Sequence, residues 1–185
     1  MIYFIADMHL GHENIIQLCN RPFKTIEEMD EALISNWNRK VKKNDTVYII
    51  GDLMWKGIDP KIYLERLNGN KVLIIGNHDS NWLCKCNPLD YFKIVTNMHI
   101  DSLNCHTVTM CHYPMLEWKK SRKEGSSKLG YLIYGHIHNK IDEMYSYLFE
   151  KENALNAGVD INNFEPVTFD ELVENNRKFK ELIIE

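Results

Sequence analysis

The chain has 185 residues, 44% of them hydrophobic, and a formal net charge of −4 at pH 7. This length suffices to bury a core, so we expect a single domain over residues 1–185 that folds without disulfides. The mild acidity excludes the strongly basic character of a dedicated nucleic-acid binder. No apolar run approaches the roughly 20 residues that span a bilayer, and no signal peptide is evident at the N-terminus, so a cytoplasmic location is expected.

Short apolar runs recur along the chain and predict buried β-strands, because each is rich in residues that favour a sheet. Each of the five clearest runs ends in a polar residue that could bind a metal. They are Ile2 to Ala6, Val47 to Ile50, Val72 to Ile75, Val108 to Cys111 and Tyr131 to Tyr134. Two further strands are expected, over residues 91–103 and 154–160.

Capping signals between the strands predict helices. The capping box Thr25-Ile26-Glu27-Glu28 predicts a helix that runs to about Lys40. Asp59-Pro60 predicts a short helix that ends at Gly69. A second capping box, from Thr168 to Glu171, predicts a C-terminal helix. Alternating strands and helices indicate an α/β layered domain, in which ligands bind outside the carboxyl ends of the strands.

The polar residues after the strands form a candidate metal centre. Asp7 and His9 are two residues apart, so their side chains leave an extended segment on the same side. His136 and His138 repeat this spacing, and Asp52 follows a glycine that allows a sharp turn. The full set comprises Asp7, His9, Asp52, Asn77, His112, His136 and His138.

Two carboxylates, one amide oxygen and four imidazoles are mixed nitrogen and oxygen donors, which suit Mn, Fe, Zn or Ni. Seven ligands are too many for one tetrahedral ion. They suit two divalent ions about 3.5–4 Å apart if one carboxylate bridges them. The sequence therefore predicts a dinuclear centre, with the identity of the metal left open.

The ordered motifs Asp-x-His, Gly-Asp, Gly-Asn-His-Asp, His and Gly-His-x-His, between Asp7 and His138, resemble those of the calcineurin-like metallophosphoesterase superfamily. The opening segment, residues 7–16 with Arg21-Pro22-Phe23, resembles a group of small bacterial and phage phosphoesterases. This resemblance implies a four-layer αββα sandwich.

The resemblance also implies a role for each residue. The first metal would be held by Asp7, His9 and His138. The second would be held by Asn77, His112 and His136, and Asp52 would bridge the two. His78 would protonate the leaving oxygen as a general acid, and Asp79 would orient the His78 ring.

The implied activity is hydrolysis of phosphoric esters by hydroxide that the metals generate from water. Ile75 stands where protein Ser/Thr phosphatases of this superfamily carry an arginine, which argues against that subclass. We expect a small phosphorylated substrate, either a phosphodiester or a nucleotide, and no membrane partner. Nucleic acid is a less favoured alternative. Monoester or diester preference and oligomeric state stay open.

A non-catalytic scaffold on the same fold is the alternative function. The presence of His78 and of all seven ligands favours the enzyme. Several other polar residues have both a structural and a functional interpretation, and we favour the structural one. They are His12, Asn14, Arg21, the basic loop 119–128, Asn156 and Asp160.

Overall fold

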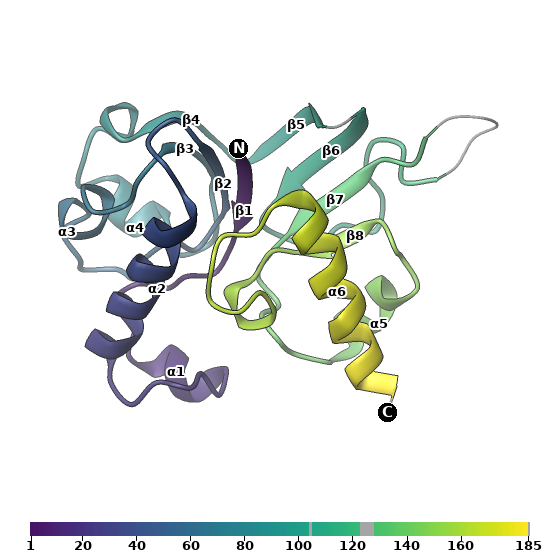
Figure 1. Cartoon of the computed structure of the whole chain (residues 1–185), viewed down its shortest axis with the longest axis horizontal. Coiled ribbons are helices and arrows are strands. Elements are labelled where there is room, and N and C mark those ends of the chain that lie inside the picture. The colour runs from purple at the N-terminus through teal and green to yellow at the C-terminus, as the bar shows by residue number, and fades with distance from the viewer. Residues whose placement is uncertain (104, 123–127, 185) are drawn as a thin grey trace.

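The computed structural model describes residues 1–103, 105–122 and 128–184, and it contains two four-stranded sheets (Figure 1). The first sheet is parallel, in the order β1 (Ile2–Ile5), β2 (Thr46–Ile50), β3 (Asn70–Ile74) and β4 (Phe92–Thr96). The second has the order β5 (Met98–Leu103), β6 (His106–Cys111), β7 (Tyr131–Tyr134) and β8 (Ala154–Asn156). Only β5 runs antiparallel to its neighbour, β6.

Successive side chains of each strand pack into two different cores, because they point to opposite faces of the sheet. Phe4 and Ile50 of the first sheet pack in a core that includes Met110 of the second sheet. Their neighbours Ile5 and Ile49 belong to a separate core on the outer face. The two sheets therefore pack face to face and each keeps a second apolar face for helices.

Helices cover both outer faces. Helix α2 (Ile26–Lys40) packs on the first sheet, and α5 (Glu143–Phe149) and α6 (Phe169–Ile184) pack on the second (Figure 1). The four-layer αββα arrangement is thus confirmed. The shorter elements are α1 (Asn14–Leu18), α3 (Lys61–Leu64), α4 (Ser80–Leu83) and the 3₁₀ turns Pro88–Asp90 and Val159–Ile161.

The predicted helix starts are confirmed at both capping boxes. The Thr25 hydroxyl accepts a hydrogen bond from the Glu28 N–H at 3.2 Å. The Glu171 carboxylate accepts one from the Thr168 N–H at 2.8 Å. The helix after Asp59-Pro60 is shorter than expected, because α3 ends at Leu64.

Two strand predictions need correction. The expected strand over 91–103 is two strands in different sheets, because the chain crosses between the sheets at Asn97. The expected strand over 154–160 ends at Asn156, and a 3₁₀ turn follows it. In each case the apolar pattern continues through a change in backbone direction.

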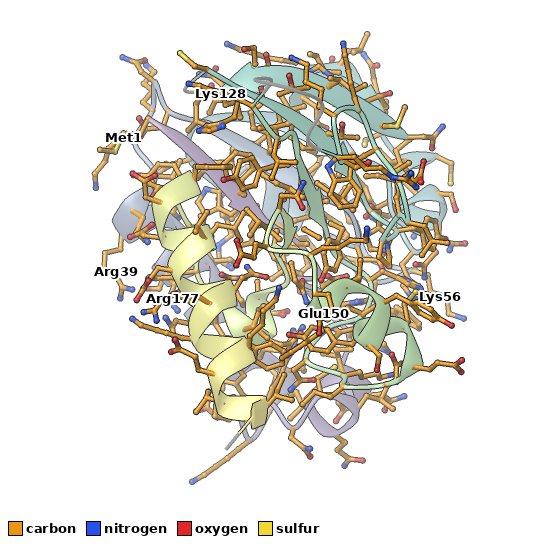
Figure 2. All side chains as sticks on the ribbon, turned by 90° about the vertical axis from the view of Figure 1, so that its right-hand side faces the viewer. Met1, Arg39, Lys56, Lys128, Glu150 and Arg177 are labelled. Carbon is orange, nitrogen blue, oxygen red and sulfur yellow. The ribbon has the colours of Figure 1, made fainter. Side chains whose placement is uncertain are left out.

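Arg39 and Lys56 are exposed charged residues, and Figure 2 shows them at opposite sides of the view. Among the described residues, no helix is both long enough and apolar enough to cross a membrane. Of the basic loop 119–128, residues 123–127 lie outside the part of the chain that the structure describes.

Candidate metal centre

The loops after the strands run together and gather all seven predicted ligands at one end of the two sheets. The loops after β1 and β2 continue side by side, because the Asp7 N–H donates to Gly51 O and the His9 N–H donates to Asp52 O, both at 3.0 Å. The second sheet joins them where the His136 N–H donates to Asp7 Oδ2 at 2.9 Å and where His112 Nδ1 donates to Ile50 O at 2.8 Å.

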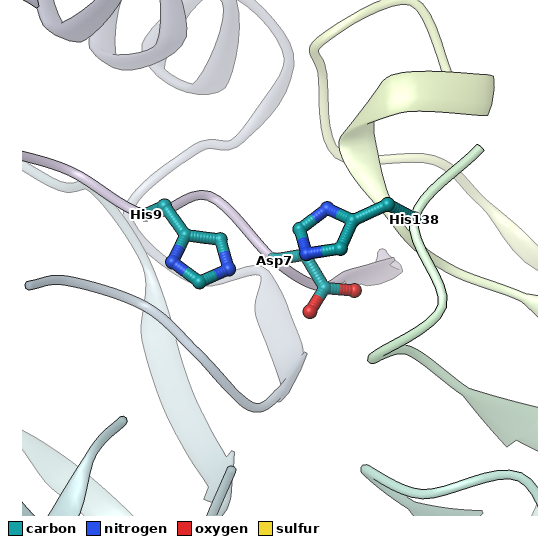
Figure 3. Close-up of side chains that lie close together, drawn as sticks. All are labelled: Asp7, His9 and His138. Carbon is teal, nitrogen blue, oxygen red and sulfur yellow. The ribbon is translucent and has the colours of Figure 1, made fainter. Parts of the chain in front are cut away.

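The first predicted donor set consists of Asp7, His9 and His138. One ligand atom of each lies within 4.8 Å of the others, and all three residues are buried. Figure 3 shows the His138 side chain meeting those of Asp7 and His9, which come from one segment of the chain. This is the grouping that the family resemblance implied for one metal.

The second predicted set surrounds the side-chain oxygen of Asn77. Asn77 Oδ1 lies 3.1 Å from His112 Nε2 and 3.0 Å from His136 Nδ1. Asp52 Oδ2 lies 3.6 Å from His9 Nε2 and 3.4 Å from His112 Nε2. The Asp52 carboxylate therefore stands between the two sets, where a bridging ligand is required.

The surroundings of His9 show whether these residues fit a metal. Its imidazole is 2% exposed, and neither ring nitrogen has a hydrogen-bond partner among the described residues. Burial lowers the pKa of His9 to about 2, so its ring is neutral and offers a lone pair. Buried polar groups are otherwise almost always paired. A coordinated ion would pair one His9 nitrogen.

His112 adds a second argument. Its Nδ1 donates a hydrogen bond to Ile50 O at 2.8 Å, so in the neutral ring the lone pair on Nε2 faces the oxygens of Asn77 and Asp52. Burial lowers the pKa of His112, but the nearby carboxylates of Asp52 and Asp7 outweigh burial and raise it to about 9. The environment thus favours positive charge at Nε2, which either a proton or a metal ion supplies.

His138 is oriented by a residue for which the sequence favoured a structural role. His138 Nδ1 donates to Asp160 Oδ2 at 2.8 Å, and Arg21 Nε donates to Asp160 Oδ1, also at 2.8 Å. Arg21 further donates to the backbone carbonyls of Asp7 at 2.7 Å and Met8 at 2.9 Å. Arg21 is therefore an ion-paired arginine that holds the first ligand loop, and Asp160 leaves His138 Nε2 free for a ligand role.

Asn156 supports the loop that carries His138. Its side-chain amide donates to the His138 backbone carbonyl at 2.8 Å, in agreement with a structural role.

Asp79 does not make the predicted contact with His78, and this is a correction. Its carboxylate accepts four hydrogen bonds from other groups, namely the N–H groups of Asp52, Leu53 and Gly76 and Nε1 of Trp82, at 2.8–3.0 Å. Asp79 is fully buried, and within the described residues it has no hydrogen bond to His78. Its carboxylate joins the Gly-Asp loop to the Gly-Asn-His-Asp loop.

His78 lies beside the donor sets and is partly exposed. Its side chain is 32% exposed, and its Nε2 lies 3.8 Å from Asp52 Oδ2. The His78 N–H donates to Asp52 Oδ1 at 2.8 Å. The ligand atoms of His9, Asp52 and His78 also lie within 4.8 Å of one another, so the geometry admits His78 either as a ligand or as an acid that faces the substrate.

Comparison with known proteins decides the family. A model of the calcineurin-like phosphoesterase family matches residues 1–140. The chain belongs to this family. All seven predicted ligands of this phosphoesterase, together with His78 and Asp79, lie inside the matched range, whereas Asp160 lies beyond it. The family membership and the Asp and His clusters support a metal-dependent phosphoric ester hydrolase.

Three relatives of this phosphoesterase extend the comparison. An uncharacterized protein of Methanocaldococcus jannaschii is 35% identical over 177 residues, which cover 94% of this chain and 89% of the relative. The gene 66 protein of Mycobacterium phage D29 is 26% identical over 170 residues, 76% of this chain and 79% of its own. The crystal structure of a protein of unknown function from Aquifex aeolicus aligns with a TM-score of 0.69 and 27% identity, covering 94% and 98% of the two chains.

The backbone of this phosphoesterase is strained at the centre. Positive φ is uncommon for residues other than glycine and costs about 1–3 kcal/mol each. Five of the seven predicted ligands nevertheless have φ between 52° and 74°. They are Asp7, His9, Asp52, His136 and His138. The fold over-determines these conformations through the hydrogen bonds between the ligand loops.

Two motif glycines leave room for ligands from neighbouring loops. A Cβ atom at Gly76 would lie 2.3 Å from Asp52 Oδ1, and one at Gly135 would lie 2.6 Å from Asp7 Oδ2. Both distances are far below van der Waals contact. The glycines are therefore needed for the close approach of the loops.

Proposed function

We propose that this phosphoesterase hydrolyses small phosphodiesters or nucleotides with two divalent ions, Mn, Fe, Zn or Ni, as cofactors. The observation that carries the proposal is the position of Asp52 between two donor sets, 3.6 Å from His9 Nε2 and 3.4 Å from His112 Nε2. The residues that would hold the ions are Asp7, His9 and His138 on one side, Asn77, His112 and His136 on the other, with Asp52 shared.

When bound, such ions neutralise phosphate charge and provide hydroxide from water at neutral pH. The chain's own residues do the remaining work. Arg21 and Asp160 fix the first ligand loop and the His138 ring, and Asp79 fixes the backbone of Asp52. His78 holds a proton on its ring and passes it to the departing oxygen, since its side chain lies beside the donor sets and is 32% exposed.

Two variants separate the metal ligands from the acid. Metal-free protein is reconstituted with each of the four metals, and ions per chain and turnover are measured. We expect about two ions per chain. Asp52→Ala should lose metal and activity together. His78→Asn should keep its metal and lose about 10²–10⁴ in turnover on esters with poor leaving groups, with a smaller loss on nitrophenyl esters.

Other outcomes contradict the proposal. One ion per saturated chain excludes the dinuclear centre. Loss of metal in His78→Asn makes His78 a ligand, and equal losses on good and poor leaving groups exclude the acid role. No turnover with any of the four metals on monoesters, linear diesters or cyclic nucleotides favours the non-catalytic scaffold.

A further inference from the structure

Two aromatic side chains flank the predicted ligands, and neither has a part in the proposed function. Trp55 lies against His78, with ring centroids 4.8 Å apart, and it stacks on His12 with centroids 3.6 Å apart and planes 1° from parallel. Tyr113 lies against His136, with centroids 4.7 Å apart, and against His112 at 5.2 Å. The two aromatic rings thus contact different histidines of the centre.

Both rings are more exposed than the other tryptophans of the chain, although Tyr147 is also exposed. Trp37 and Trp82 are fully buried, and Trp118 is 7% exposed. Trp55 is only partly buried, and Tyr113 is 47% exposed. Core packing therefore does not account for either ring. Lys56 Nζ lies 5.4 Å from the Trp55 ring centroid, so a planar ligand on Trp55 would have to displace this exposed ammonium. A flat aromatic surface beside a catalytic site suits a planar ligand.

The backbone holds Trp55 in place. Its N–H donates to Leu10 O at 2.9 Å, in the loop that begins with Asp7 and His9. The His12 ring, 8% exposed, covers one face of the indole. His12 thereby has a positioning role that connects it to the site, while Asn14 is exposed at the start of α1.

We propose that Trp55 and Tyr113 stack the two nucleobases on either side of a scissile phosphodiester. The substrate would be a short linear nucleotide diester, such as a dinucleoside phosphate. This inference rests on the proposed function and names its substrate class. Stacking is tolerant of base identity, because every base has a π-face. The net charge of −4 argues against a long polyanion, which needs an extended basic surface.

The position of His78 assigns the two sides. Because Trp55 is the ring beside His78, the base on Trp55 belongs to the leaving nucleoside. Hydroxide forms a new bond to phosphorus, the bond from phosphorus to the leaving oxygen breaks, and the His78 proton moves to that oxygen. Water and a dinucleoside phosphate then yield one nucleoside and one nucleoside monophosphate, whose base lies on Tyr113.

The test compares three dinucleoside phosphates: one with both bases, one without the base on the leaving side and one without the base on the other side. For each enzyme variant, the ratio of kcat/KM between the full and the base-deleted substrates is measured. Trp55→Ala should lower the ratio for the leaving-side base by about 5- to 150-fold, and Tyr113→Ala should lower the ratio for the other base equally. This range corresponds to about 1–3 kcal/mol of stacking per base, at about 1.4 kcal/mol per factor of ten.

Matched variants guard against a change in folding. Trp55→Phe and Tyr113→Phe keep an aromatic ring and should retain most of the ratio. Tyr147→Ala removes a tyrosine that is 56% exposed on α5, and it should leave both ratios unchanged. A ratio that falls equally in the alanine and phenylalanine variants, or that does not fall in the alanine variants, overturns the proposal.

A binding experiment does not depend on turnover. The affinity for a nucleoside monophosphate, measured by isothermal titration calorimetry, should fall about 5- to 150-fold in Tyr113→Ala, whether or not His78 is intact. Unchanged affinity excludes stacking on Tyr113. If the protein binds the nucleoside monophosphate with the expected dependence on Tyr113 but shows no turnover, the proposed hydrolysis is wrong and the stacking role of Tyr113 is supported.

Discussion

Asp79→Asn tests the hydrogen-bond network that joins two ligand loops. In the native protein, Oδ1 accepts from the Leu53 N–H and from Trp82 Nε1, and Oδ2 accepts from the N–H groups of Asp52 and Gly76. Asparagine has only one acceptor oxygen, so in either orientation its NH₂ group faces two donors. The substitution therefore leaves two buried donors without an acceptor.

The loss of folding stability follows from the number of unpaired donors. An unpaired buried donor costs about 1–3 kcal/mol, so two of them cost about 2–6 kcal/mol. This is a large part of the roughly 5–15 kcal/mol that stabilises a domain. With a slope of about 2 kcal/mol/M, the midpoint of urea unfolding should fall by about 1–3 M. The metal-free protein should be measured, because a bound metal adds its own stabilisation.

A control substitution separates this role from catalysis. Trp82→Phe removes one of the four donors and leaves no donor unpaired, so its cost measures the packing lost at this fully buried position without the unpaired donors of Asp79→Asn. If Asp79 instead acts by orienting His78, Asp79→Asn should leave the urea midpoint within about 0.3 M and lose activity only on poor leaving groups. That combination would refute the role of Asp79 as the link between the two loops.

Three other substitutions test the surroundings of the site. Asp160→Asn weakens the hydrogen bond that orients His138, so metal affinity should fall about 10- to 100-fold in a competition titration with a chelator, and an unchanged affinity would exclude the role. Gly76→Ala places a Cβ atom 2.3 Å from Asp52 Oδ1, so the protein should hold less metal per chain in elemental analysis, and full occupancy would contradict the steric argument. Thr25→Ala removes the N-cap of α2 and should cost about 0.5–2 kcal/mol in urea unfolding, whereas Thr25→Ser should cost little.

Much of the fold could be predicted because local chemistry decides it. The capping box at Thr25 determines where α2 begins, and the apolar runs that end in polar residues correspond to strands that lead into the site. The crossing at Asn97 was not predicted, because apolar residues recur through both β4 and β5 and only one residue separates the two strands. What distinguishes the two strands is the sheet that each joins, which depends on the whole chain.

In the site, too, some features follow from local sequence and others depend on the folded chain. The seven predicted ligands follow strands directly, so parallel pairing alone gathers most of them at one edge, and their roles as ligands stay a prediction. The partners of Asp79 depend on how closely two loops approach, which local sequence does not determine. Asp160 was considered structural, although its place just after β8 repeats the pattern of a strand followed by a carboxylate.

The ion pair between Arg21 and Asp160 joins positions 139 residues apart, and it ties the beginning of the chain to a segment near its end. During synthesis, Asp7 and His9 leave the ribosome long before His138 and the carboxylate that orients it. On a nascent chain that stops short of Asp160, the first donor set therefore lacks the carboxylate that orients His138. If this set binds metal as proposed, stable uptake would follow only after translation has passed Asp160, and a truncated product would compete weakly with the finished protein for metal.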